Sequence, residues 1–386
     1  MLLKEGEEKY DGYGFPLSEL SVQQVKDIKK CDVVYTRANK SWGKYVIKRY
    51  LPKNKEKLKK LLRKGLNYEL REWVWFEVSG AKELSKQHAA SYFDSLCRKA
   101  ERDLETPVNK QIELDLPRSF THHPWVQSEE GQVRLRKVLR AFSQQNPSVG
   151  YCQGLNFLAA FLMLTQSRSA ERAFWILICI VDRLLYPGTY ASGLEGCHVE
   201  MRTLSSLLDR RKPALSKHLQ SSGCDISLFA ADWFITLFST SLPSESVARV
   251  WDAFLGEGAK VLHRIGLVLL LRQEKELLRA EHAGEAMVLV RKSVSALYDH
   301  DSLMKEAFSK DVVGGLSLQK LNSTRKKHAK EVKLMIEKRR KDQESFKPTI
   351  DTQTILKAKK EESERRRRWL AGQGGEEEGG EVENGE

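Results

Sequence analysis

Apolar residues recur at helical spacing along most of the chain. Between 129 and 145 they fall at steps of two to four residues among basic ones, as on an amphipathic helix: Val133, Leu135, Val138, Leu139 and Phe142. Similar patterns occupy 82–105, 199–210, 228–238, 244–255 and 259–280. Because the regular alternation typical of strands is missing from the sequence, the pattern predicts an all-α protein.

Two stretches, 155–164 and 173–181, are apolar on nearly every side, and the polar link Thr165–Arg172 joins them. A helix that is apolar all round has to be surrounded by other helices, so we expect these stretches to form a central helical hairpin. Each is shorter than the roughly 20 apolar residues that a membrane span needs. We therefore interpret the aromatic residues of the hairpin as packing groups and not as a ligand site: Phe157, Phe161, Phe174 and Trp175.

Prolines punctuate the helical pattern, and the character of the chain changes after about residue 310. Pro243 and Ser244 follow Leu242 as a helix-start signal does. No repeat of fixed period is present, so a repeat solenoid is not supported. The charged stretch 320–347 has helical character, whereas the Gly/Glu tail 371–386 carries too little apolar surface to order itself, and we expect it to be disordered.

The formal net charge of +13 is concentrated in two places. Residues 37–64 hold 12 Lys/Arg against one Glu, and residues 325–368 hold 17 Lys/Arg against eight Asp/Glu. The tail 371–386 holds six Glu and no base, which leaves the body of the chain close to neutral. Because the bases flank the body and form no stripe across it, we do not expect nucleic acid as a partner.

The basic segment 37–64 allows two interpretations. Its bases are interleaved with Trp42, Tyr45, Tyr50 and Leu51, so it could bind an acidic lipid surface or an acidic partner. Alternatively it is a solvated, lysine-rich helix that leads into the folded domain. The short run Arg365–Arg368 beside Trp369 has the same ambiguity, since such runs are common in disordered tails.

The cysteines and the N-terminal residues indicate the cellular compartment in which we expect the protein. The six cysteines show no C-x-x-C pairing and no metal-like spacing to histidine. Met1-Leu2-Leu3 runs directly into charged residues, unlike a signal peptide. We therefore expect reduced thiols in a cytoplasmic protein, either free or peripheral on endomembranes.

The first candidate motif is Ile112-x-x-Asp115-x-x-Arg118. Pro117 cannot donate a helical hydrogen bond and disfavours the α conformation of Leu116, which predicts a helix end near Asp115. Arg118 then lies just past that end, where its planar, permanently charged fork suits phosphate oxygens and Asp115 could steady it. Taken alone the pattern is weak, and without the second motif an arginine in a surface ion pair is the preferred explanation.

The second candidate motif is Tyr151-x-Gln153-Gly154. Asn146–Gly150 reads as a loop and the apolar helix follows near Leu155, so Gln153 is expected at a helix start, where an anion is favoured. Gln offers a donor and an acceptor for positioning a water, and Gly154 permits a close approach of a partner's backbone. A capping or merely exposed glutamine is the alternative.

A cation and a water-orienting amide are the two groups that a slow GTPase lacks. The helix predicted between the motifs and the loops around it permit Arg118 and Gln153 to meet, without requiring it. The sequence contains no phosphate-binding loop, kinase-type glycine loop, nucleophile elbow or zinc-protease helix. We therefore expect no cofactor or metal of its own. If Arg118 and Gln153 act on a nucleotide such as GTP, a partner protein must hold it together with its Mg²⁺.

Both motifs resemble the paired finger motifs of the TBC family, whose members are GTPase-activating proteins for Rab GTPases. The resemblance extends over about 60–310: Gly65-Leu66, Leu70-Arg71 and Trp75 look like the opening motif, and Trp233-Phe234, Phe238 and 249–254 look like later ones. Residues 11–16, DGYGFP, are similar to a segment preceding the domain in some members. Arg118-Ser119-Phe120 departs from the commoner Arg-Thr-Phe but keeps the hydroxyl.

The resemblance implies an all-α, irregular multi-helix domain of two helical subdomains over 60–310. It is preceded by an extension, 1–59, and followed by a charged segment, 311–370, and the tail 371–386. It also implies an activator of a partner enzyme in vesicle trafficking, acting on a Rab GTPase in its GTP form through Arg118, the arginine finger, and Gln153, the glutamine finger. The implied supporting residues are Asp115, Arg71, Tyr151, Gly154 and Asn156, with Arg71 holding Asp115 or the finger loop. The alternative is a non-catalytic Rab- or membrane-binding adaptor of the same fold.

Overall fold

The computed structural model describes residues 10–17, 20–102 and 104–345, and in these the chain is helical. Apart from one isolated antiparallel bridge between Tyr10 and Pro16, the described residues contain no β-structure. The all-α prediction is therefore confirmed. The chain divides into two compact units, 1–334 and 335–386, and only the residues up to Ser345 of the second are described.

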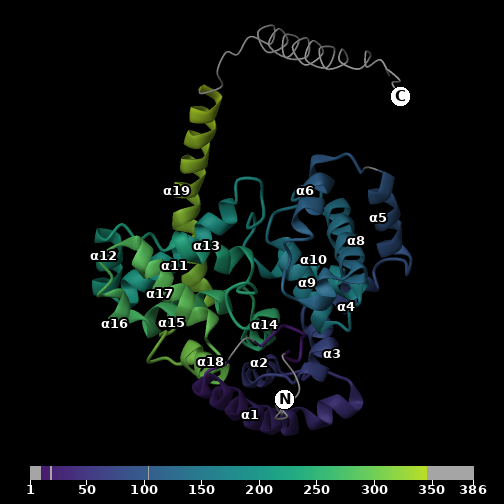
Figure 1. The fold of residues 1–386 in the computed structure, drawn as a ribbon, viewed down its shortest axis with the longest axis horizontal. Coiled ribbons are helices and arrows are strands. Elements are labelled where there is room, and N and C mark those ends of the chain that lie inside the picture. The colour runs from purple at the N-terminus through teal and green to yellow at the C-terminus, as the bar shows by residue number, and fades with distance from the viewer. Residues whose placement is uncertain (1–9, 18–19, 103, 346–386) are drawn as a thin grey trace, which may run out of the picture. The chain divides into compact units, whose positions relative to one another are not determined.

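Three N-terminal helices form one end of the first unit (Figure 1): α1 (Val22–Lys48), α2 (Lys55–Lys64) and α3 (Tyr68–Val78). Helix α1 begins with a capping box, in which the Ser21 hydroxyl accepts from Gln24 N–H and the Gln24 amide accepts from Ser21 N–H. It packs against α2 and α18. The basic segment 37–64 is thus the second half of α1 together with α2, and its Trp42 and Tyr45 are buried.

A first group of helices is built around α8, which packs against α5, α6, α7, α9 and α10. Helices α9 and α10 are the predicted central hairpin, and residues along both are buried on nearly every side. Phe161, Phe174 and Trp175 are buried as expected, whereas Phe157 is only half-buried. The group comprises α4 (Ala81–Ser85), α5 (Tyr92–Arg102), α6 (Pro107–Asp115), α7 (Pro124–Gln127), α8 (Glu129–Gln145), α9 (Leu155–Thr165), α10 (Ala170–Cys179) and the π-helical continuation η1 (Ile180–Leu184).

A second group of helices is built around α15, which packs against α11, α13, α16, α17 and α18. The single patterns expected over 82–105 and 259–280 are each divided, because short turns separate α4 from α5 and α15 from α16. The second group comprises α11 (Glu195–Arg211), α12 (Pro213–Ser221), α13 (Ser227–Ile235), α15 (Lys260–Arg272), α16 (Glu274–Leu277), α17 (Ala283–Ser295) and α18 (His300–Phe308).

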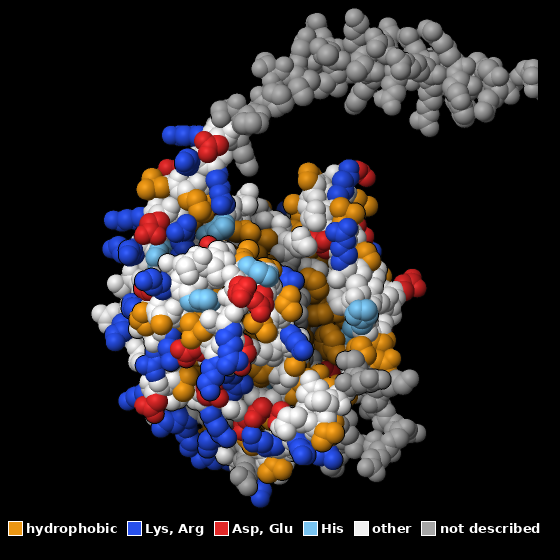
Figure 2. All heavy atoms as spheres, turned by 60° about the vertical axis from the view of Figure 1, so that its left-hand side comes forward, with side chains coloured by type: hydrophobic (Ala, Val, Ile, Leu, Met, Phe, Trp, Pro, Cys, Tyr) orange, Lys and Arg blue, Asp and Glu red, His pale blue; other side chains and the backbone are white. Residues whose placement is uncertain are grey.

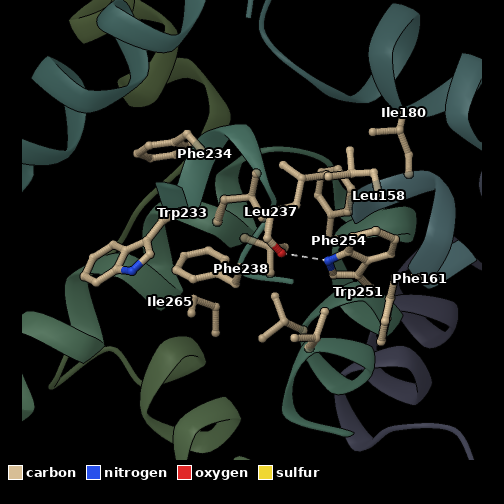
Figure 3. Close-up of a cluster of buried hydrophobic side chains, with 14 of the residues drawn as sticks. Leu158, Phe161, Ile180, Trp233, Phe234, Leu237, Phe238, Trp251, Phe254 and Ile265 are labelled. Carbon is tan, nitrogen blue, oxygen red and sulfur yellow. Dashed lines mark hydrogen bonds between the residues drawn. The ribbon is translucent and has the colours of Figure 1, made fainter. Parts of the chain in front are cut away.

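Helix α14 (Ser244–Glu257) joins the two groups, since it packs against α2, α3 and η1 as well as α15 and α18. It begins directly after Pro243, as the sequence predicts. Its buried Trp251 donates a hydrogen bond of 2.9 Å to the carbonyl of Leu237. Figure 3 shows Leu158 and Phe161 of α9 on one side of this bond and Trp233 and Phe238 on the other. The two helical groups therefore share one hydrophobic core.

The last helix, α19 (Leu318–Ser345), coincides with the charged stretch expected to be helical. Within the first unit it is fixed by Arg325, whose guanidinium Nε donates to the Glu200 carboxylate at 2.8 Å. The predicted domain boundaries near 60 and 310 stay predictions. The predicted disordered tail, 371–386, lies outside the described residues.

None of the described helices combines the length and the apolar character needed to cross a lipid bilayer. The six cysteines are free thiols, five of them buried and Cys152 half-buried. Burial and the neighbouring Asp115 carboxylate raise the pKa of Cys152 to about 11.

Candidate functional site

Arg118 lies three residues beyond the end of α6. Thr106 caps the start of this helix by accepting from Asn109 N–H, and the buried Ile112 and Leu116 hold its last turn against the core. Leu116 keeps α-helical torsions (φ −54°, ψ −55°), so the expectation that Pro117 displaces it from the α region is wrong. The helix nevertheless ends at Asp115, because Pro117 has no N–H to donate and the chain continues as tight turns.

Asp115 is a buried carboxylate that links the two candidate motifs. It accepts hydrogen bonds from the Tyr151 hydroxyl at 2.9 Å and from the Gln111 amide at 3.1 Å. Arg118 Nη1 lies 3.8 Å from it, which is ion-pair range but longer than a hydrogen bond. Burial, followed by the charge of Asp115, raises the pKa of Tyr151 well above its usual value, so its hydroxyl remains a donor. Asp115 therefore holds the second motif more closely than it holds Arg118.

Ser119 forms a second link between the motifs. Its hydroxyl donates to the Asp115 carbonyl at 2.7 Å and accepts from the Asn156 amide at 2.8 Å. Asn156 in turn accepts from Gly154 N–H at 3.0 Å. The sequence pattern alone does not indicate Ser119 as a site residue, although the hydroxyl retained at this position is the available signal. Through these bonds the loop of Arg118 and the loop of Gln153 are fixed to each other.

Gln153 is exposed at the start of α9, as predicted. The next residue, Gly154, is the N-terminal cap with φ +112°, a backbone conformation that favours glycine. A Cβ on Gly154 would lie 2.3 Å from the side chain of Ile235 of this same chain. The expectation that Gly154 leaves room for a partner's backbone is therefore wrong, because Ile235 already fills that space.

Arg71 does not contact Asp115, contrary to one role suggested for it. Its guanidinium is fully buried and forms a two-pronged pair with Asp252, each N···O distance being 3.0 Å. It also donates to Glu245 at 2.9 Å and to the hydroxyl of Tyr13. Trp75 donates to the same Asp252 carboxylate at 2.8 Å. Arg71 therefore joins α3 to α14 and to the N-terminal residues, since its partners come from those segments.

The side chain of Arg118 is 68% exposed, and the Asp115 carboxylate lies within 4 Å of it. It is one of the residues that line a groove of about 1250 Å³, together with residues from 11–17, α1, 120–123 and 239–246. An exposed guanidinium and an exposed amide on two mutually fixed loops can contact an anionic group and a water carried by another molecule. In the described part of the chain, no group of three or more His, Cys, Asp or Glu is placed to hold a metal ion.

Comparison with known proteins gives a consistent family. Residues 68–278 match the model of the Rab-GTPase-TBC domain. TBC1 domain family member 2A of Homo sapiens is 35% identical over 313 residues, which are 78% of this chain and 33% of that protein. Growth hormone-regulated TBC protein 1 of Xenopus laevis is 31% identical over 286 residues, 73% of this chain and 82% of that protein.

A solved structure shares the fold. The Chlamydomonas flagellar RabGAP TBC domain is 39% identical, with a TM-score of 0.72, and the match covers 78% of this chain and 99% of that one. The chain spans about a third of the length of the TBC1 domain family member 2A relatives.

Proposed function

We propose a function from the premise that this chain belongs to the RabGAP-TBC family. It accelerates GTP hydrolysis by a Rab-type GTPase in its GTP form, to which it supplies Arg118 and Gln153. The observation that carries the proposal is the joint placement of these two exposed side chains on loops tied by the Tyr151–Asp115 and Asn156–Ser119 hydrogen bonds. The GTP and its Mg²⁺ belong to the partner.

Arg118 provides a cation for the charge that develops between the β- and γ-phosphates in the transition state. The fork of an arginine can donate to two phosphate oxygens at once, which the point charge of a lysine cannot do. The side chain is ready for this contact because it is mostly exposed and makes no hydrogen bond with Asp115, only the 3.8 Å ion pair. Asp115 remains satisfied by Tyr151 and Gln111 when Arg118 turns toward the partner.

Gln153 orients the attacking water. Its amide can accept from the water and donate to a γ-phosphate oxygen, and the N-terminus of α9 adds a favourable field for the anion. The turn at Gly154 packs against Ile235, which fixes the backbone position from which the Gln153 side chain extends. This fixed relation to Arg118 is what in-line attack requires, because misplacing a reacting group by 1 Å can cost about 10²-fold in rate.

The test is single-turnover GTP hydrolysis by a panel of GTP-loaded Rab proteins, with and without the full chain. On each Rab that wild type accelerates, Arg118→Ala is expected to lower the rate by about 10³-fold or more. Gln153→Ala is expected to lower it by about 10²-fold. The matched controls Arg98→Ala on α5 and Gln87→Ala after α4 remove exposed side chains of the same kinds and should leave the rate unchanged.

Two outcomes oppose the proposal in different ways. Wild-type rates from both finger variants would show that these residues do not carry the activity. Unchanged Rab binding with no acceleration, by wild type or by any variant, would instead identify a non-catalytic adaptor of the same fold.

A further inference from the structure

The segment Tyr10–Pro16 precedes the residues that match the family model and folds into a closed turn. The Asp11 carboxylate accepts from the N–H groups of Tyr13 at 2.8 Å and of Phe15 at 2.9 Å, and Asp11 N–H donates to the Phe15 carbonyl at 2.8 Å. Gly14 holds φ +90°, which favours glycine. The turn is therefore fixed by its own hydrogen bonds and keeps one shape.

This turn is anchored in the core by Tyr13. The side chain is buried, its ring lies edge-on to Tyr68 with centroids 5.2 Å apart, and its hydroxyl donates to Glu245 at 2.8 Å. Arg71 donates to the same hydroxyl, and Ser244 donates to Asp11. Helices α3 and α14 thus hold the turn in one position.

The opposite side of the turn covers the loop that follows Arg118. The ring of Phe15 meets Phe120 edge-on at 5.0 Å and His123 edge-on at 4.8 Å. The buried His123 accepts from Val126 N–H at Nδ1, so its ring proton is on Nε2, which donates to the Tyr13 carbonyl at 2.8 Å. Burial lowers the pKa of His123, which keeps this neutral form. The turn therefore touches both ends of residues 120–123.

Phe120, two residues after Arg118, has an unfavourable backbone. Its φ is +46°, a left-handed conformation that is unfavourable for a residue with a side chain. Its ring lies between Phe15 at 5.0 Å and Phe157 of α9 at 5.2 Å. Removing Phe15 takes away one of the two aromatic rings that pack on this strained residue, and leaves Phe157 and the backbone bond from His123 N–H.

We propose that the turn Tyr10–Pro16 is a positioning element for Arg118, with Phe15 as its positioning residue. The proposal rests on the proposed function, because it concerns where the arginine points during hydrolysis. Phe15 acts through Phe120 and His123, while Asp115 and Ser119 hold the loop from its other end. A segment outside the matched domain thereby sets the conformation of the finger loop.

The test compares full-chain Phe15→Ala with wild type on a Rab that wild type accelerates. At saturating concentration, the single-turnover rate is expected to fall by about 10-fold to 10²-fold. The affinity for the same Rab loaded with a non-hydrolysable GTP analogue should be unchanged, because ground-state docking does not need the finger in place. Phe15→Tyr keeps the ring and should restore the rate. Phe76→Ala, which removes a half-buried phenylalanine from α3, is the matched control.

A double-mutant cycle makes the test specific to Arg118. If Phe15 acts through that residue, adding Phe15→Ala to Arg118→Ala changes the rate no further. Equal losses in both backgrounds, or a wild-type rate from Phe15→Ala, would overturn the proposal. Phe15→Leu, which keeps the apolar volume without the ring contacts, takes the place of Phe15→Ala if that variant does not fold.

The cycle also separates this proposal from the proposed function. Loss of activity in Arg118→Ala together with a wild-type rate in Phe15→Ala overturns the positioning claim alone. A wild-type rate in Arg118→Ala overturns the finger assignment, and the positioning claim with it.

Discussion

At the scale of residues, the positions of the exposed side chains Arg118 and Gln153 depend on side chains that are buried beneath them. Ser119 has no exposed area, yet its hydroxyl joins the end of α6 to the start of α9 through Asn156. Because the two loops come from different helices, each hydrogen bond between them restricts how far Arg118 and Gln153 can move apart. The loss of one such bond should therefore affect hydrolysis as well as stability.

Ser119→Ala is expected to lower the free energy of unfolding by about 1–3 kcal/mol, because the buried Asn156 amide loses its acceptor. The hydrolysis rate at saturation should fall too, while Ser119→Thr, which keeps the hydroxyl, should retain activity. Urea unfolding and single-turnover kinetics measure the two effects. A Ser119→Ala protein with wild-type rate and stability would show that this link is dispensable.

Local sequence signals indicate where several candidate site residues lie relative to helix ends, but they do not indicate all of the partners of those residues. Asp115, Tyr151, Gly154 and Asn156 lie together because the two motifs end and begin helices, which prolines and glycines indicate locally. Arg71 could not be assigned in this way, since its partner Asp252 comes from α14, far along the chain. No local pattern states which buried carboxylate an arginine will meet.

At the scale of elements, a buried histidine at the start of α18 packs against α1. His300 is 4% exposed, and its ring lies 5.5 Å from that of Tyr35 on α1. Burial, reinforced by Arg249 and Arg71 and opposed by Glu245, lowers the pKa of His300 from 6.5 to about 4. The native protein therefore keeps this ring neutral at pH values where the unfolded chain binds a proton.

Stability should consequently fall between about pH 6.5 and pH 4. In that window the unfolded chain carries one more proton at His300, so unfolding becomes easier as pH drops, and the contribution is complete above pH 6.5. The loss attributable to this group is about 3 kcal/mol. Denaturant unfolding at several pH values should give a flatter profile for His300→Gln than for wild type; parallel profiles would contradict the assignment.

The pattern of elements was largely predictable, and the exceptions have physical causes. The α9–α10 hairpin and the helix start at Ser244 were evident from continuous apolar runs and from Pro243. In the sequence the turn Tyr10–Pro16 is indicated only by a short resemblance, because its contacts with Phe120 and Arg71 are long-range. Trp42 and Tyr45 were candidates for a lipid surface, but helix packing buries them.

At the scale of the whole molecule, the exposed Lys and Arg residues of segment 37–64 form a basic surface on α1 and α2. Figure 2 shows several Lys and Arg side chains along the lower edge of the view, the height at which α1 lies in Figure 1, besides others on the rest of that face. Ile47 among them is 84% exposed, and Glu56 is the one acidic residue in the segment. The exposed members are Lys40, Lys44, Lys48, Arg49, Lys53, Lys55, Lys57, Lys60 and Lys64.

We expect this basic surface to bind anionic membranes by charge, since Trp42 and Tyr45 are buried and cannot insert. Replacing Lys40, Lys44 and Lys48 with Glu should weaken co-sedimentation with phosphatidylserine vesicles by about 10²-fold, because each cation contributes about 1 kcal/mol. The same replacement of Lys217, Lys275 and Arg279 in the second helical group is the matched control. Equal binding to neutral vesicles, or no effect of salt, would exclude this mode of recruitment.

At the centre of the proposed function, the guanidinium of Arg118 enters the active site of a Rab GTPase and donates to phosphate oxygens. The substitution Arg118→Lys tests this most directly. The variant keeps the charge and the loop but loses the planar, two-pronged donor. Single-turnover hydrolysis on a Rab that wild type accelerates should show a loss of about 10³-fold, close to that of Arg118→Ala. Wild-type acceleration by Arg118→Lys would contradict the claim.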